Sequence, residues 1–289
     1  MNYTVFTLLP DIFDSFLSNS LIARGVSNHI IKVNRINWRE NYGIGCYKQI
    51  DDKPFGGGHG MVLQPDHIFN ALTDTNLIST LYKKSNQIII HDRISPNNSN
   101  FYQNWKLNKK NIRKVTVSLT PRGFPINQQI IEWLSYNFDE IGILCGRYEG
   151  FDSRVGELVD LEVSLGNFVL NGGEVGAMAL IEGISRLLPG FVTKSENVMH
   201  DSFSSGLNQY QEQQEYVIGK RKLLQKLDKI EVHQSIDLFS DNDWKSSVLP
   251  KIEHPQYSRP EIWNNIQVPE VLVGGNHKKI QDWRLNWWK

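Results

Sequence analysis

The stretch LCGRYEGFDSRV (residues 144–155) decides the fold, because it places a glycine directly after a short apolar run. The run at residues 140–144 is bounded by turn signals, as in the buried strands of a parallel sheet. Glycine tolerates positive φ and lets main-chain N–H and C=O groups approach a ligand directly. The stretch therefore predicts a strand whose end opens into a binding loop lined by backbone.

Three further Gly-rich stretches stand at comparable places in the chain. They are PFGGGHGM (residues 54–61), LTPRG (119–123) and LGNFVLNGGE (165–174). Taken singly, a Gly-Gly pair is more often a tight turn than a binding loop. Four such stretches in one chain indicate a backbone that folds closely around a small ligand.

The remaining apolar patterns predict an α/β domain that ends near Phe191. Short apolar runs predict strands at residues 4–8, 30–36, 87–91, 115–119 and 140–144, and helices are predicted at residues 65–72, 127–136 and 175–188. Polar residues up to Gly60 indicate a loop after the second strand. Strands that alternate with helices are typical of a parallel sheet covered on both faces.

Length and composition allow one large core or two modest ones, since the chain has 289 residues of which 40% are hydrophobic. The apolar runs are far shorter than the roughly 18 residues of a membrane helix, and the first residues carry Asp11 and show neither a basic flank nor an apolar h-region. We therefore expect a cytoplasmic protein without a membrane partner. Cys46 and Cys145 lack the spacing of metal ligands, so we expect two buried thiols and neither a zinc site nor a disulfide.

Two common nucleotide-binding motifs are missing. A Walker-type loop needs Gly-Lys-Ser/Thr at a helix start, whereas residues 59–61 read His-Gly-Met. The GxGxxG fingerprint also fails, because no such turn follows the first strand. A phosphate-loop enzyme is thus a disfavoured alternative, and the loops after residues 119, 145 and 165 suit the adenine and ribose of a neutral or cationic cofactor better.

A set of motifs then gives the chain a family resemblance. Together with the Gly-rich stretches these motifs are FTLLPDIF (6–13), IDDKPFGGGHGM (50–61), AMALIEGISRLLPG (177–190), DSF (201–203), HPQYSRPEIW (254–263) and VPEVLVGGNHKKIQDWR (268–284). In this order the chain resembles the bacterial tRNA (guanine-N1)-methyltransferase family. The resemblance implies methylation of N1 of guanosine-37, next to the anticodon of tRNA, with S-adenosylmethionine as the cofactor.

The same resemblance implies an α/β fold of the SPOUT type, a parallel sheet with a deep trefoil knot, which is an exception to the usual absence of threaded chains. It also implies a homodimer with active sites between the subunits. We expect a methyltransferase domain (1–192), an interdomain linker that carries the catalytic Asp (193–207), a family-atypical insertion (208–252) and a shortened, mainly helical C-terminal domain that binds tRNA (253–289).

The resemblance also assigns residues to the site. The cofactor pocket would be formed by Leu119, Thr120, Pro121, Gly146, Tyr148, Glu149, Leu165, Gly166, Asn167, Phe168, Val169, Leu170, Gly172 and Gly173. Asp201 would be the general base that takes the N1 proton, and Arg186 would stabilise the charge on guanine O6. Ser202 would help to hold the guanine base.

Each assignment has an alternative. Asp201 before Ser202 is also typical of a helix cap, and Arg186 at a helix end also suits the helix dipole. Glu149 and Asp152 either form a solvent-exposed acidic pair or, as the family's magnesium dependence implies, support Mg²⁺ near the methionine carboxylate. No residue is assigned as a metal ligand.

The chain departs from the family pattern at the insertion and at the end. Residues 220–230 place Lys and Arg opposite an apolar face, which fits a solvated amphipathic helix or, alternatively, phosphate contacts that replace those of the shortened tail. Asn167 and Phe168 stand where the family commonly has Asp and Tyr, a change that preserves backbone contacts. The alternative functions are a SPOUT methyltransferase of another RNA target and an RNA-binding homologue without turnover.

Overall fold

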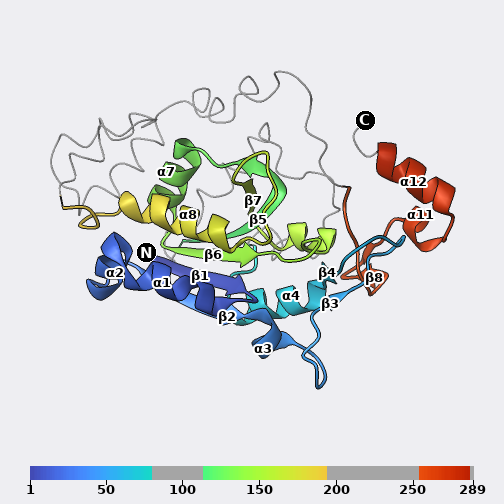
Figure 1. The fold of residues 1–289 in the computed structure, drawn as a ribbon, viewed down its shortest axis with the longest axis horizontal. Coiled ribbons are helices and arrows are strands. Elements are labelled where there is room, and N and C mark those ends of the chain that lie inside the picture. Colours follow the sequence, from blue (N-terminus) through green and yellow to red (C-terminus); the bar gives the residue numbers. More distant parts are fainter. Residues whose placement is uncertain (80–112, 194–253, 287–289) are drawn as a thin grey trace.

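The computed structural model describes residues 1–79, 113–193 and 254–286. Its centre is a five-stranded sheet in the order β2-β1-β6-β5-β7, with every pair of neighbours parallel (Figure 1). The strands are β1 (Asn2–Thr7), β2 (Lys32–Asn37), β5 (Lys114–Pro125), β6 (Glu140–Cys145) and β7 (Leu161–Ser164). The expected parallel α/β sheet is therefore confirmed.

Helices connect and cover these strands. They are α1 (Asp14–Ser18), α2 (Ser20–Ser27), α3 (Trp38–Tyr42), α4 (Pro65–Asp74), α7 (Gln128–Asn137) and α8 (Glu174–Arg186), with 3-10 turns η1 (Pro10–Phe13) and η2 (Ser153–Glu157). A short antiparallel pair, β3 (Asp51–Asp52) with β4 (Val62–Leu63), stands beside the main sheet.

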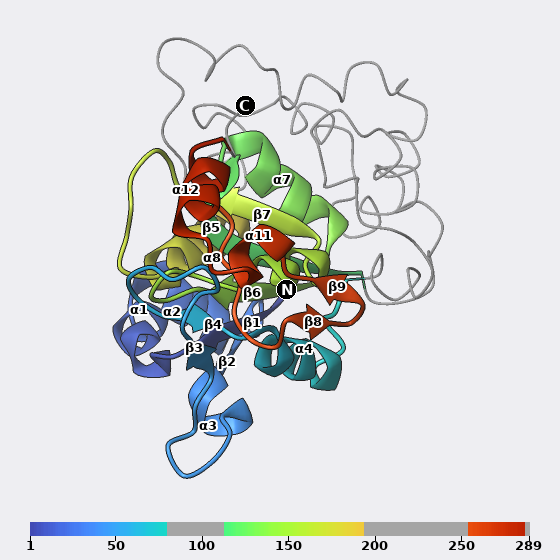
Figure 2. The same cartoon turned by 90° about the vertical axis from the view of Figure 1, so that its right-hand side faces the viewer.

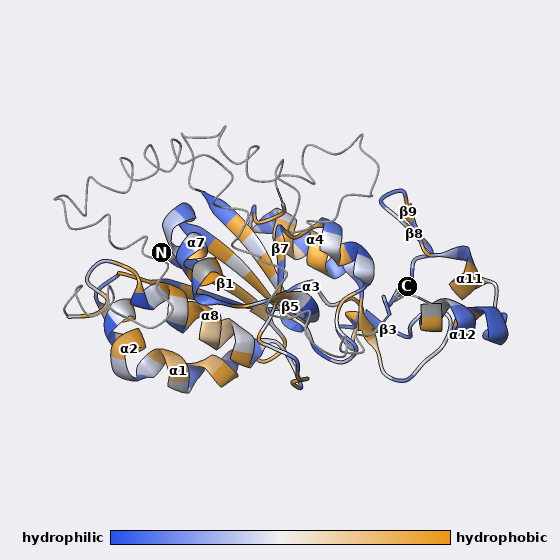
Figure 3. Cartoon of the chain, turned by 90° about the horizontal axis from the view of Figure 1, so that it is seen from above, coloured by the Kyte–Doolittle hydropathy of each residue, from blue (hydrophilic) through white to orange (hydrophobic). Residues whose placement is uncertain are grey.

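Alternate side chains of the strands build a core on one face of the sheet. Tyr3 and Val5 of β1 lie on this face with Ile141 and Ile143 of β6, and all four are fully buried. Helices α7 and α8 pack against each other here, and α2 packs against α8. Figure 3 shows the resulting apolar positions in orange along the strands and along α1, α2 and α8.

The opposite face holds a second core. Phe6 and Leu144 point to this side, and the Phe6 ring stacks on Trp38 at 5.1 Å between ring centroids. The expected polar loop before Gly60 is wrong here, because Trp38 begins helix α3. Asn37 caps this helix by accepting hydrogen bonds from the Arg39 and Glu40 amides. Buried Trp38 thus belongs to the core.

The LTPRG stretch lies within β5 and does not form a separate turn. Leu119 and Phe124 both align with Val163 of β7, so residues 120–123 form a bulge between them. A Cβ atom at Gly123 would collide with the Val163 backbone. Glycine is required here for close approach of two strands, and not for positive φ.

Residues 254–286, called here the C-terminal part, lie at one end of the sheet beside β3 and β4 (Figures 1 and 2). They contain the hairpin β8 (Ile262–Trp263) and β9 (Ile266–Gln267), and helices α11 (Glu270–Val273) and α12 (His277–Asn286). A separate small cluster comprises buried Val268, Leu272 and Ile280. Most residues of α12 are hydrophilic (Figure 3).

Most element predictions are confirmed by an observed strand or helix, and helix α2 was not predicted. The predicted strand at residues 87–91, the insertion at 208–252 and its helix at 220–230 lie outside the described residues. The division into domains stays a prediction.

Candidate ligand-binding site

A cavity of about 480 Å³ lies beyond the ends of β6 and β7 and against the bulge of β5. In open parallel sheets, ligands bind outside the carboxyl ends of the strands, where the connecting loops diverge. The cavity volume falls within the range of about 300–1,000 Å³ that is usual for small-molecule sites. Its position and size therefore make it the candidate binding site.

All fourteen residues assigned to the cofactor pocket line this cavity. They come from the β5 bulge, from the loop after β6 and from the loop between β7 and α8. The structure thus brings together three stretches that are far apart in sequence. Their contacts with a cofactor stay a prediction.

Two glycines allow the β7–α8 loop to lie directly on the end of β6. The Gly173 amide donates to the Gly146 carbonyl at 3.0 Å, and Gly172 forms an isolated β-bridge with Arg147. A Cβ atom at Gly173 would lie only 2.7 Å from the Cα atom of Cys145. Any side chain at residue 173 would push helix α8 away from the sheet and open the cavity wall.

A buried ion pair anchors the start of α8 beneath the cavity. The Glu174 carboxylate, 1% exposed, pairs with Arg147 at 2.8 Å and accepts a hydrogen bond from the Thr7 hydroxyl at 2.7 Å. Arg147 also donates to the Asn171 carbonyl at 3.3 Å. These contacts join β1, the β6 loop and the β7–α8 loop, so they fix the loops relative to the sheet.

The two cysteines differ, and the expectation of two buried thiols is wrong for Cys46. Both are free, but Cys46 is exposed in the loop after α3, whereas Cys145 is buried at the end of β6. Burial raises the pKa of the Cys145 thiol, and the nearby Glu174 carboxylate raises it further. Cys145 is therefore a protonated packing residue next to the cavity and not a nucleophile.

Glu149 lies half-buried on the cavity wall. Its amide donates to the Met61 carbonyl at 3.0 Å, and a Cβ atom at Gly60 would collide with its carboxylate. The Gly-rich stretch at residues 54–61 therefore packs on the loop after β6. Next to it, Tyr148 has a φ of 60° and its hydroxyl accepts a hydrogen bond from Arg39 at 3.2 Å.

Asp152 lines the cavity but is neither solvent-exposed nor free to bind an ion. It is 0% exposed, and its carboxylate pairs with the buried Arg154 at 2.9 Å. The acidic pair expected from Glu149 and Asp152 is thus wrong for Asp152, because the fold buries this carboxylate against a guanidinium.

The structure does not bring the predicted catalytic residue Arg186 to this cavity. Arg186 is half-buried in the last turn of α8, and Gly173 precedes the first turn. A helix of this length spans about 18 Å at 1.5 Å per residue. Arg186 therefore lies at the far end of α8 from the cavity of the same chain. Asp201 and Ser202 lie outside the described residues.

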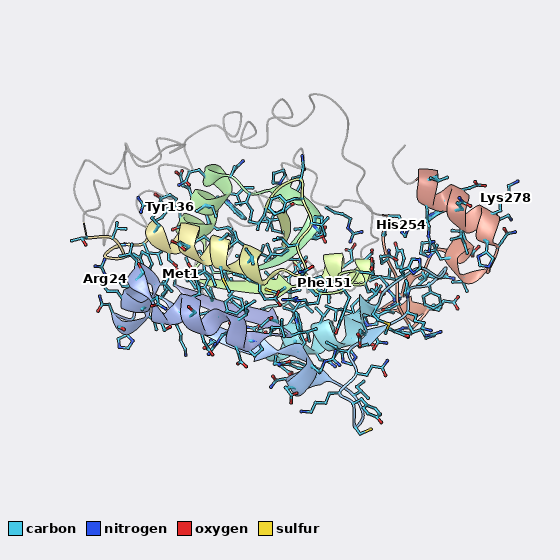
Figure 4. All side chains as sticks on the ribbon, viewed as in Figure 1. Met1, Arg24, Tyr136, Phe151, His254 and Lys278 are labelled. Carbon is cyan, nitrogen blue, oxygen red and sulfur yellow. The ribbon has the colours of Figure 1, made fainter. Side chains whose placement is uncertain are left out.

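Several cavity residues were missed by the sequence analysis. The sequence analysis predicted no role for Arg122, which lies in the LTPRG stretch. It also predicted none for Glu162, which lies on β7, a strand without a long apolar run. His254 and Gln256 come from the C-terminal part, about 100 residues further along the chain than the loop they face. Only the folded chain places them there, and Figure 4 shows His254 where that part meets the sheet near Phe151.

No helix in ranges 1–79, 113–193 and 254–286 is both long and apolar enough to cross a membrane. Within the same ranges, no group of three or more His, Cys, Asp or Glu side chains is arranged to hold a metal ion.

Known proteins resemble this chain over nearly its whole length. A model of the family tRNA (Guanine-1)-methyltransferase TrmD matches residues 1–247 and 234–288. The tRNA (guanine-N(1)-)-methyltransferase of Crocosphaera subtropica is 34% identical over 284 residues, which are 98% of this chain and 85% of that protein. That of Staphylococcus carnosus is 32% identical and covers 98% of this chain and 84% of its own.

A solved structure gives the same result. The crystal structure of tRNA (m1G37) methyltransferase from Aquifex aeolicus aligns with a TM-score of 0.50 and 25% sequence identity. The alignment covers 99% of this chain and 88% of that one.

Proposed function

The chain belongs to the tRNA (guanine-N1)-methyltransferase family and has its SPOUT fold, and from this premise we propose that it transfers a methyl group from S-adenosylmethionine to N1 of guanosine-37 in cytoplasmic tRNA. The observation that carries the proposal is that all fourteen residues that the family resemblance assigns to the cofactor line one and the same cavity. The loops around it offer backbone N–H and C=O groups for the adenine.

The charges on the cavity wall suit a cationic ligand. Arg147 and Asp152 are already paired with Glu174 and Arg154. Among the described residues that line the cavity, this leaves the carboxylates of Glu149 and Glu162 and the guanidinium of Arg122 to face a ligand. Two negative charges and one positive charge complement a zwitterionic amino acid that also carries a sulfonium. Bound there, S-adenosylmethionine supplies a methyl group activated by its positively charged sulfur.

The acceptor needs a base, because guanine N1 bears a proton at neutral pH and its lone pair is not available for attack. Asp201 takes this proton as general base. The negative charge that then develops on O6 is stabilised by the guanidinium of Arg186. Ser202 holds the guanine, so that its N1 lies in line with the methyl carbon and the sulfur that leaves.

The position of Arg186 supports an active site shared between two copies of the chain. Within one chain it lies a full helix away from the cavity. Large apolar side chains at the cavity are exposed, including Tyr148, Phe168 and Val169, of which Val169 is 81% exposed. Apolar groups gathered on a surface are typical of an interface. A second copy that covers this face supplies Arg186 to the cavity of its partner.

Of the two carboxylates that the family resemblance relates to Mg²⁺, only Glu149 stays free in the cavity. Asp152 is committed to Arg154, whereas Glu149 is half-buried and faces the cavity. Glu149 is thus the carboxylate that would support Mg²⁺ near the methionine carboxylate, since hard divalent cations prefer oxygen ligands.

Methyl transfer to a tRNA transcript with guanosine at positions 36 and 37 tests the proposal. Asp201→Ala should lower kcat about 10²- to 10⁴-fold, because it removes the general base, while binding of S-adenosylhomocysteine stays unchanged. Asp11→Ala, at an exposed aspartate of η1, is the matched control and should keep the wild-type rate. Full activity of Asp201→Ala would rule out the assigned base. A wild-type protein that binds S-adenosylhomocysteine but methylates no tRNA would favour an RNA-binding homologue or another RNA target.

A complementation experiment tests the shared site. Arg186→Ala and Gly173→Ala are each expected to be inactive, for different reasons. Co-expressed, they form mixed dimers in which one cavity is intact and is completed by an intact Arg186. Roughly a quarter of the wild-type rate should return, because about half of the dimers are mixed and each has one intact site. No recovery in isolated mixed dimers would mean that Arg186 and the cavity act within one chain.

A further inference from the structure

The C-terminal part is joined to the cavity loop by an ion pair that is almost completely buried. Asp152 is 0% exposed and Arg154 is 2% exposed. Both lie in the loop and 3-10 turn after β6, where Asp152 lines the cavity and Arg154 follows the cavity residue Ser153. Neither was assigned a role by the proposed mechanism.

The Asp152 carboxylate is saturated with hydrogen bonds from both sides of the junction. Its Oδ1 accepts from the Arg154 amide at 3.0 Å and from Arg154 Nε at 2.9 Å. Its Oδ2 accepts from Arg154 Nη2 at 2.9 Å, from the Ser258 amide at 2.6 Å and from the Ser258 hydroxyl at 3.0 Å. Ser258 belongs to the C-terminal part, so the two bonds that it donates to Oδ2 form only when that part is docked.

The Arg154 guanidinium reaches the same segment. Its Nη2 donates to the Ser258 carbonyl at 2.7 Å and its Nη1 donates to the Pro260 carbonyl at 2.8 Å. Burying two charges is costly unless every remaining donor and acceptor is satisfied. Here the main chain of residues 258–260 supplies those partners, so undocking of the segment would leave a buried guanidinium unsatisfied.

The docked segment is also a wall of the cavity. His254 and Gln256 line the cavity, and the Gln256 carbonyl accepts from the Ser153 amide at 2.8 Å. On the other side of the same loop, the Asp152 amide donates to the Leu63 carbonyl at 3.0 Å. The loop after β6 is therefore held between β4 and the segment 254–260.

We propose that Arg154 is a positioning residue that couples docking of the C-terminal part to the shape of the methyl-donor cavity, an inference that rests on the proposed function. Arg154 does not itself line the cavity. It holds His254 and Gln256 against the cavity, and an RNA that binds the C-terminal part acts on donor affinity through this pair.

Thermodynamic linkage makes the coupling measurable from either side. If docking of the segment strengthens donor binding, donor binding must stabilise the docked segment by the same factor. The amides of Ser153 and Ser258 report docking, since their hydrogen bonds cross the junction.

The test measures binding of S-adenosylhomocysteine by titration calorimetry, and amide hydrogen exchange of residues 152–158 and 256–261 with and without this probe. Arg154→Lys keeps the charge but loses the two-pronged contact with the carbonyls of residues 258 and 260. It should weaken binding about fivefold or more and abolish the protection that the probe gives to residues 256–261. Ser258→Ala, which removes one hydroxyl bond, should show the same changes to a smaller degree.

Arg259→Ala is the matched control. It lies in the same segment, but its ion pair with Asp52 is at the surface, with the arginine side chain 67% exposed. Surface pairs contribute little, so its affinity should stay within about twofold of the wild type. A merely structural pair would lower the melting temperature of Arg154→Lys and leave the affinity of the folded protein unchanged.

The outcomes separate the two proposals. If folded Arg154→Lys and Ser258→Ala bind S-adenosylhomocysteine as strongly as the wild type, the coupling is overturned and the proposed function stays intact. The coupling is also overturned if the wild type binds S-adenosylhomocysteine but its amide hydrogen exchange at residues 256–261 does not become slower. This outcome counts even if Arg154→Lys fails to fold. Absence of binding by the wild type would contradict the proposed function and the coupling with it.

Discussion

The sheet and the C-terminal part hold together by different means. The sheet has apolar cores on both faces, which bury side chains from β1, β5, β6 and the helices. In the C-terminal part, the separate cluster consists of Val268, Leu272 and Ile280. It is attached to the sheet domain by the Trp263 ring, which joins the second core, and by polar contacts such as the bond of 2.7 Å from Trp263 Nε1 to the Asp66 carboxylate. A segment this small does not bury enough apolar surface to be stable alone.

This difference divides the cavity into two kinds of wall. The inner wall, formed by the ends of β5, β6 and β7, is fixed by the cores beneath it. The outer wall, formed by His254 and Gln256, depends on the polar junction at Arg154. The inner wall should therefore open only when the protein unfolds, whereas the outer wall should respond to changes at the surface.

The reactivity of the two cysteines gives the largest expected effect. Cys145 lies at the inner wall, and burial raises the pKa of its thiol, so it stays protonated at pH 8. Alkylation of Cys145 should be at least about a thousandfold slower than that of exposed Cys46, because it requires global opening of a stable domain. Mass spectrometry of the alkylated peptides measures both rates. Comparable rates would mean that the inner wall opens locally.

Truncation of a side chain in the sheet core has the next largest expected effect. Ile143→Ala removes a fully buried side chain of β6 and should lower the free energy of unfolding by about 2–5 kcal/mol in urea titrations. Ile44→Ala is the control, since Ile44 is 69% exposed and its truncation should cost no more than about 0.5 kcal/mol. Equal effects of the two variants would contradict the described core.

Truncation in the C-terminal part should have the smallest effect on global stability. Leu272→Ala removes one of the three buried side chains of the small cluster. It should change the global free energy of unfolding by less than about 1 kcal/mol, while hydrogen exchange in residues 262–286 becomes faster, because this part opens separately. A loss as large as that of Ile143→Ala would show that both regions unfold as one unit.

Local sequence patterns predicted the inner wall well. The apolar runs at residues 115–119 and 140–144 are strands, and the glycines at 146 and 173 stand where the backbone must approach closely. Periodicity and glycine placement are local signals, so they can be read without the fold. The family motifs then assigned fourteen residues that line one cavity.

Local sequence patterns could not predict the outer wall. Asp152 was expected to be a solvent-exposed acid or a support for Mg²⁺, because nothing near it in the sequence indicates its bonds to Ser258. His254 reaches the cavity only through the docking of a distant segment. Trp38 likewise stands among polar residues, and only the packing against Phe6 reveals it as core. Such contacts join residues far apart in the chain and leave no local pattern.

The most direct test of the central claim is the analysis of nucleosides from a guanosine-37 tRNA transcript after incubation with labelled S-adenosylmethionine and either the wild type or Gly173→Ala. The wild type should yield 1-methylguanosine at position 37. Folded Gly173→Ala should yield almost none, because a methyl group at residue 173 meets Cys145 and displaces the cavity wall. Label in another nucleoside, or wild-type activity in Gly173→Ala, would contradict the claim that this cavity serves guanine-N1 methylation.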